Sequence, residues 1–135
     1  MAESYEQIRV ERNEAAAIIT LNRPAKFNAY TAQMGAELTR AINAASEDDA
    51  VRAIILTGEG KHFCAGADIS DGASSFDTKS GSGSKNFGGG ERSEDGAGFV
   101  GALFNSKKPV ITAFNGSAVG VGLTMTLPSD FRIAA

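Results

Sequence analysis

Short apolar runs along the first sixty residues predict strands. Residues 7–11 alternate between apolar and charged side chains, with Ile8 and Val10 together on the apolar side. This alternation is typical of a half-buried strand. The runs at 15–21 and 52–57 are apolar almost throughout, and they predict two further strands that are more deeply buried.

Between the second and third of these runs, the spacing of apolar residues becomes helical. Thr31 is a suitable N-cap, and we expect the helix to continue to about Glu47. The apolar positions of this helix recur every three or four residues and form one face: Met34, Leu38, Ile42 and Ala45. The order strand, strand, helix, strand indicates an α/β protein.

The second half of the chain repeats this arrangement after a polar insertion. Residues 70–98 consist largely of Ser, Gly, Asp and Lys, and we expect a mobile loop there. A short helix then places Phe99 and Leu103 on one face, and residues 109–114 predict another strand. Residues 118–127 are apolar with two glycines, and they predict a buried helix.

Two of the predicted strands lead directly into glycine-rich loops, at 58–68 and at 115–122. If these strands are neighbours in a parallel sheet, both loops leave the sheet at the edge where ligands bind in open α/β folds. In the first loop, small residues and Gly66 let a ligand approach the backbone, so that the amide of Ala67 can point at a ligand oxygen. On spacing alone, a tight structural turn is the commoner explanation of the same residues.

The second loop places glycines before an apolar stretch, which leaves unpaired N–H groups at the start of a helix. Two such loops side by side supply two N–H donors to one developing oxyanion, as the chemistry of a thioester enolate requires. Close helix packing is the alternative explanation for these glycines.

The composition argues against several classes of function. The chain has 135 residues, of which 42% are hydrophobic and 21% charged, as in ordinary globular domains. Its net charge of −3 argues against nucleic acids and anionic membranes as partners. Neither a secretory signal nor a membrane-spanning run is visible in the sequence. Cys64 is the single cysteine, so an internal disulfide is impossible and a reducing, intracellular compartment is expected.

Metal and nucleotide chemistry is not indicated either. His62 is the only histidine, and it has no Cys or Asp at a metal-binding spacing, so we expect no metal site. The Gly-Ser repeat at 80–85 does not satisfy the phosphate-binding pattern G-x-x-x-x-G-K-[ST].

Several motifs in a fixed order carry a family resemblance. These are LNRP at 21–24, FNA at 27–29, CAGAD at 64–68, NGSAVGVG at 115–122 and PSDFRIA at 128–134. Together they resemble the crotonase (enoyl-CoA hydratase/isomerase) family over nearly the whole chain, except for the 70–98 insertion. The resemblance implies an α/β fold of stacked ββα turns, with residues 1–135 as its N-terminal core.

The resemblance also implies a substrate and an assembly. The substrate is an acyl-CoA thioester, so coenzyme A enters with the substrate and no resident cofactor is expected. Members of the family form trimers, often paired into hexamers, and they are roughly twice as long as this chain. The chain stops directly after an apolar, strand-like stretch at 131–135, and we expect that it ends early. The apolar side chains that later elements would cover are then exposed: Val121, Leu123, Met125, Leu127, Phe131 and Ile133.

Carried over position by position, the family's two oxyanion-hole amides fall on Ala67 and Val121. The family's contacts with coenzyme A fall on residues of the segment after Pro24 and of the CAGAD loop: Ala25, Lys26, Phe27, Ala29, Ala65, Asp68 and Ile69.

The chain departs from the family's hydratases at one catalytic position. Thr124 stands where many hydratases carry a glutamate, and a threonine is no general base near neutral pH. The family's other catalytic acid lies further along than residue 135. The sequence therefore favours an enoyl-CoA isomerase, which needs one acid, over a hydratase that uses two glutamates. The alternative is a catalytically incomplete acyl-CoA-binding or assembly protein of the same fold.

Overall fold

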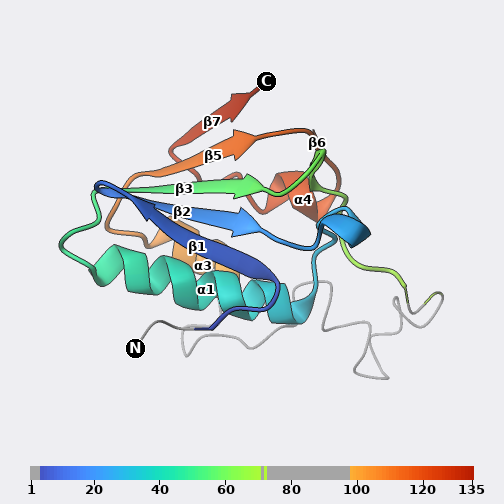
Figure 1. Ribbon diagram of the computed structural model, residues 1–135, viewed down its shortest axis with the longest axis horizontal. Helices are drawn as coiled ribbons and strands as arrows, with labels where there is room; N and C mark the ends of the chain where they lie inside the picture. The colour runs from blue at the N-terminus through green and yellow to red at the C-terminus, as the bar shows by residue number, and fades with distance from the viewer. Residues whose placement is uncertain (1–3, 71, 73–97) are drawn as a thin grey trace.

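The computed structural model describes residues 4–70, 72 and 98–135. Five strands form the main sheet, in the order β1-β2-β3-β5-β7 (Figure 1). Their bounds are Ile8–Asn13 for β1, Ala16–Leu21 for β2, Ala53–Gly58 for β3, Val110–Phe114 for β5 and Phe131–Ala134 for β7. The expected loop at 70–98 lies almost entirely outside the described residues.

Strand pairing follows from the connections. The hairpin of β1 and β2 is antiparallel, whereas β3 pairs in parallel with both β2 and β5, and β5 pairs in parallel with β7. In the β3–β5 register, Ile54 faces Val110 and Leu56 faces Thr112. Because these two strands are parallel neighbours, the loops that follow them leave at the same edge of the sheet, as the sequence predicted.

Those loops contain a second, two-stranded sheet. Strand β4 (His62–Cys64) follows β3, strand β6 (Ser117–Ala118) follows β5, and the two pair in parallel. These strands were not predicted from the sequence, because runs of two or three residues carry no readable alternation. They hold the two glycine loops against each other.

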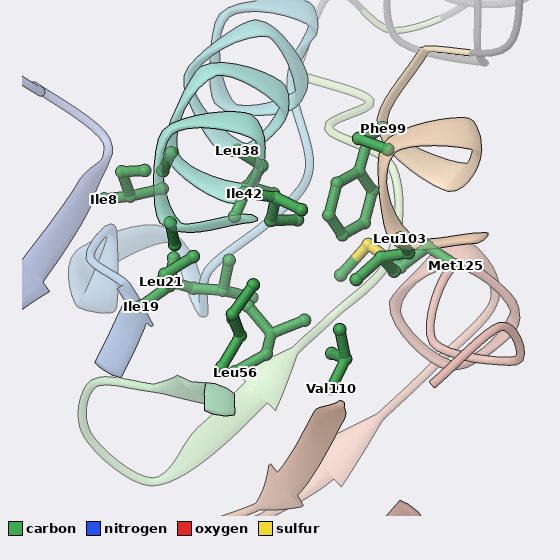
Figure 2. Packing of buried hydrophobic residues seen from close by; sticks show 14 of the residues in the cluster. Ile8, Ile19, Leu21, Leu38, Ile42, Leu56, Phe99, Leu103, Val110 and Met125 are labelled. Atoms are coloured by element: carbon green, nitrogen blue, oxygen red, sulfur yellow. The ribbon is translucent and has the colours of Figure 1, made fainter. Parts of the chain in front are cut away.

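Helix α1 (Ala32–Glu47) lies along one side of the sheet, with α3 (Gly98–Phe104) on the same side (Figure 1). The Thr31 hydroxyl accepts a hydrogen bond from the amide N–H of Met34 at 3.0 Å, which confirms the predicted N-cap. The predicted apolar face of α1 and the predicted face of α3 are both buried. Figure 2 shows Leu38 and Ile42 of α1 close to Phe99 and Leu103 of α3, above the side chains of the sheet.

Strand β1 differs from the expected alternation. Ile8 is buried, but Val10 is 38% exposed. Helix α1 covers only the beginning of this edge strand, where the carboxylate of Glu37 accepts the amides of Gln7 (2.9 Å) and Ile8 (3.2 Å). Val10 lies farther along, at a shallow hollow between β1 and the C-terminal half of α1, so it stays partly in solvent.

The expected buried helix at 118–127 is wrong in length and in burial. Helix α4 spans only Val121–Thr124, and the chain continues beyond it in turns. Gly120 precedes it with φ 56°, a conformation that no regular helix contains. Leu123 and Leu127 are 46% and 59% exposed.

Several large apolar side chains of the second half face solvent. Among the residues expected there, Met125 is an exception, because it is 2% exposed and belongs to the core, and Val121 is only partly exposed. Exposed apolar side chains around α4 and on β7 are Val119, Leu123, Leu127, Phe131 and Ile133, and two more, Val100 and Phe104, lie on α3. None of the helices in the described part of the chain is long and apolar enough to cross a bilayer.

We expect Thr31→Ala to lower the free energy of unfolding by about 1 kcal/mol, because it removes the N-cap of α1. The matched control is Thr39→Ala in the same helix, whose hydroxyl bonds only back to the Gly35 carbonyl at 2.8 Å. Urea unfolding followed by circular dichroism measures both variants. Equal losses in the two would contradict the capping role.

We also expect the chain to self-associate through the apolar residues of β7, since Phe131 and Ile133 are 63% and 61% exposed. The double variant Phe131→Ser/Ile133→Ser should reduce association in sedimentation velocity. Val10→Ser on the opposite edge strand is the control and should not. A sharp monomeric boundary for the unmodified chain, together with a cooperative thermal transition, would show the expectation to be wrong.

Candidate functional site

A hollow of about 430 Å³ opens beside the loops that follow β2 and β3. Its lining comes from two stretches of chain: Ala25, Lys26, Phe27 and Ala29 from the first, and Ala65, Ala67, Asp68, Ile69 and Ser70 from the second. The structure thus brings together all seven residues to which the family resemblance assigns coenzyme A contacts, together with Ala67. Their role in binding stays a prediction.

The first wall of the hollow begins with the 3-10 helix η1 (Pro24–Lys26) and two residues of left-handed backbone. Phe27 and Asn28 have φ values of 52° and 55°, which is uncommon for a bulky residue such as phenylalanine. Strain of this kind persists only where surrounding contacts hold the backbone in place.

The buried side chain of Asn28 supplies several of those contacts. Its Oδ1 accepts the amide of Arg23 at 2.8 Å, and its Nδ2 donates to the carbonyl oxygens of Glu59 and His62, both at 2.9 Å. One amide side chain therefore ties the first wall to the turn between β3 and β4. Asn28 lies within the FNA motif at 27–29, but no local sequence pattern indicates this structural role.

The second wall contains Ala67, which forms a parallel bridge with Tyr30. The amide of Tyr30 donates to the carbonyl of Gly66 at 2.7 Å, and the amide of Asp68 donates to the carbonyl of Tyr30 at 2.8 Å. In extended backbone, successive peptide groups point to opposite sides. The N–H of Ala67 is therefore directed to the side of this segment opposite Tyr30.

The loop that follows β5 lies against this second wall. The amide of Val119 donates to the carbonyl of Cys64 at 3.0 Å. A Cβ on Gly122 would lie 2.5 Å from the same carbonyl oxygen, and a Cβ on Gly66 would lie 3.1 Å from the carbonyl of Val119. Gly122 lies in α4, so close packing of this helix, the alternative explanation for the glycines, is confirmed at this position.

Within the described residues, the amides of Ala67 and Val121 donate no hydrogen bond to the protein. Val121 is the first residue of α4, so its N–H has no partner inside the helix. Two unpaired amides thus stand on two loops that touch each other. Unpaired backbone N–H groups are the kind of donor that an oxyanion hole uses.

Asp68, which lines the hollow, forms a partly buried ion pair with Arg23. Nη2 of Arg23 lies 3.1 Å from Oδ2 of Asp68, with side chains that are 19% and 12% exposed. Hydrogen bonds from the hydroxyl and amide of Ser70, together with Arg23, lower the pKa of Asp68, and they outweigh its burial. Asp68 is therefore held as a carboxylate.

Cys64 is a buried free thiol beneath the two loops. Burial raises its pKa, so it stays protonated at neutral pH and serves as a packing residue. Burial likewise raises the pKa of Tyr30.

The described residues around the hollow offer few side chains for acid–base chemistry. The hydroxyl of Thr124 donates to the carbonyl of Gly120 at 3.3 Å on an exposed surface. Among the described residues that line the hollow, Asp68 is the only carboxylate, and it is paired with Arg23. No cluster of metal-ligating side chains occurs within the described ranges.

Known proteins support the resemblance. The family model for enoyl-CoA hydratase/isomerase matches residues 11–135. An enoyl-CoA hydratase of Alternaria alternata is 37% identical over 98% of this chain, and a probable enoyl-CoA hydratase of Rhodobacter capsulatus is 39% identical over 98%. The chain spans only 42% and 47% of the lengths of these two relatives.

The fold is shared as well. The crystal structure of an enoyl-CoA hydratase/carnithine racemase from Magnetospirillum magneticum superimposes with a TM-score of 0.79 at 30% identity. That match covers 97% of this chain and 47% of the crystallised one. The described residues therefore have the crotonase-type α/β fold. They correspond to about half of the length of the crystallised relative. By its sequence, its sheet and the extent of these matches, the chain belongs to the enoyl-CoA hydratase/isomerase family.

Proposed function

We propose that this chain provides the thioester-binding part of an enoyl-CoA hydratase/isomerase site. Coenzyme A lies along the hollow between the two walls, and the amides of Ala67 and Val121 receive the thioester oxygen. The observation that carries the proposal is the pair of unpaired amides on touching loops. Charge grows on the thioester oxygen when an enolate forms, and one such donor is worth about 3 kcal/mol in a transition state.

Within this reaction class we favour isomerisation, because Thr124 offers no base where many hydratases carry a glutamate. The two relatives named above are hydratases by name, so the preference depends on this one position. Coenzyme A arrives as part of the substrate, with no resident cofactor. A trimeric or hexameric assembly and a reducing, intracellular compartment complete the proposal.

A second function is a non-catalytic acyl-CoA-binding or assembly protein. It is favoured by one observation, the pairing of the hollow's only described carboxylate with an arginine. Both functions require thioester binding, so the binding experiment below tests the step that they share.

The binding step is tested by replacing single backbone amides with esters, in chains assembled by ligation with lactic acid at the chosen position. At Ala67 this removes an N–H that bonds nothing in the described protein. It also weakens the Gly66 carbonyl as acceptor of the Tyr30 amide, so a small loss of stability is expected. Affinity for crotonyl-CoA should fall about threefold to tenfold, the range for one neutral hydrogen bond. Affinity for free coenzyme A, which has no thioester oxygen, should not change.

The matched control is the same replacement at Ala65, whose amide donates to the carbonyl of Phe27 at 3.0 Å. This ester should lower thermal stability more than the Ala67 ester. Both esters weaken the preceding carbonyl as an acceptor, but the Ala65 ester also removes an N–H that bonds inside the protein. Isothermal titration calorimetry and thermal unfolding measure the pair. Unchanged crotonyl-CoA affinity in the Ala67 ester would remove Ala67 from the oxyanion hole.

We expect the 135-residue chain to hydrate or isomerise enoyl-CoA very weakly. Positioned acid–base groups contribute about 10²–10⁴ in rate, and no such group stands free in the described hollow. Hydration is measured as the loss of the conjugated thioester's ultraviolet absorbance, and isomerisation of a 3-enoyl-CoA is measured as its gain. Robust turnover that Asp68→Asn abolishes would make Asp68 a catalytic base and refute this assignment.

A further inference from the structure

We propose that Arg23 and Asp68 act together as a latch that positions the Ala67 amide, so that Asp68 is a positioning residue and not a contact for coenzyme A. The inference rests on the proposed function, because it concerns the same thioester site. It revises the role that the family resemblance implied for Asp68.

The latch joins the two walls of the hollow. Arg23 belongs to the chain that leads into the first wall, and Asp68 belongs to the second. One guanidinium nitrogen, Nη2, lies 3.1 Å from Asp68 Oδ2, and the other, Nη1, donates to the carbonyl of Ala29 at 2.6 Å. The planar guanidinium thus holds both walls at once, which a lysine ammonium cannot do with the same fixed geometry.

Both oxygens of Asp68 are engaged. While Oδ2 meets Arg23, Oδ1 accepts the amide of Ser70 at 2.9 Å and its hydroxyl at 2.5 Å. A carboxylate bound in this way has little freedom to turn toward a ligand. Its negative charge would also repel the phosphates of coenzyme A if it faced them without a partner.

Burial gives the latch its strength. Ion pairs on open surfaces contribute almost nothing to stability, because water and salt screen them. Here the two side chains are 19% and 12% exposed, whereas those of the surface pair Arg9–Glu59 are 43% and 42% exposed. The latch therefore keeps a charge-assisted bond, and the surface pair serves as its natural control.

The pairing of Arg23 with Asp68 helps to fix the orientation of the Ala67 peptide group. On one side of it, the carbonyl of Gly66 is held by the amide of Tyr30; on the other, the amide of Asp68 is held by the carbonyl of Tyr30. The side chain of Asp68 is then fixed by Arg23. With both neighbours anchored, the free N–H of Ala67 keeps one direction before any ligand arrives, as preorganised stabilisation requires.

The test compares Asp68→Asn, Arg23→Lys and the double variant with Arg9→Lys as the surface-pair control. The probes are crotonyl-CoA and free coenzyme A. Calorimetry gives the two affinities, and isotope-edited infrared spectroscopy gives the carbonyl stretch of the bound thioester, which falls when the oxygen accepts hydrogen bonds. This spectroscopic readout separates positioning from a merely structural role.

Both single variants should keep their affinity for free coenzyme A within about threefold, less than one ordinary hydrogen bond contributes. They should lose most of the carbonyl shift and the preference for crotonyl-CoA. The double variant should be no worse than the worse single variant, because the two residues act as one unit. Arg9→Lys should behave as the unmodified chain. A full carbonyl shift in Asp68→Asn, or additive losses in the double variant, would overturn the latch.

Hydrogen exchange followed by mass spectrometry tests the latch without any ligand. In Asp68→Asn, exchange should quicken in the segments 25–30 and 65–70 and stay unchanged in α1. Unchanged exchange in both segments would overturn the proposal. If the unmodified chain fails to bind crotonyl-CoA, the proposed function is refuted, and the exchange result still decides whether the latch exists.

Discussion

Parallel pairing of β3 with β5 is the constraint on which the rest of this structure depends. Two parallel neighbours must release the chain at the same edge, so the loops after Gly58 and after Phe114 emerge side by side. Strands β4 and β6 then pair, and the 119–122 segment packs against Cys64. Without this pairing, the amides of Ala67 and Val121 would belong to unrelated surfaces.

The two walls of the hollow are held in different ways. The first wall carries left-handed backbone at Phe27 and Asn28, and the buried Asn28 side chain holds it through three hydrogen bonds. The second wall relies on main-chain bonds to Tyr30 and on the pair between Arg23 and Asp68. Hydrogen bonds on one side, and main-chain bonds with a partly buried ion pair on the other, thus hold the two walls of the hollow in place.

Much of this fold was readable from the sequence, where side-chain periodicity is strong. The strands around Ile19, Ile54 and Val110 and the helix with its Thr31 cap were predicted correctly, because burial and capping act locally. The short helix α4 was not, because the apolar character of 118–127 does not reveal that Gly120 adopts a positive φ. The gathering of the predicted residues around one hollow was implied by family motifs alone. The contacts of Asn28 and the pairing of Arg23 with Asp68 join residues distant in the chain, and no local pattern announces them.

The tight seating of the two glycine loops also limits how this part of the gene can vary. A Cβ on Gly122 would lie 2.5 Å from the Cys64 carbonyl oxygen, and a Cβ on Gly116 would overlap the Lys61 carbonyl oxygen. Every other amino acid carries a Cβ. After any missense change in these two codons, that Cβ would clash with the main chain of the neighbouring loop, which cannot move aside as a side chain can. At these codons, only silent nucleotide changes are compatible with the present backbone. A randomised library of the 115–122 loop that is selected for folded protein should therefore return glycine at both positions, while leaving exposed neighbours such as Val119 free to drift.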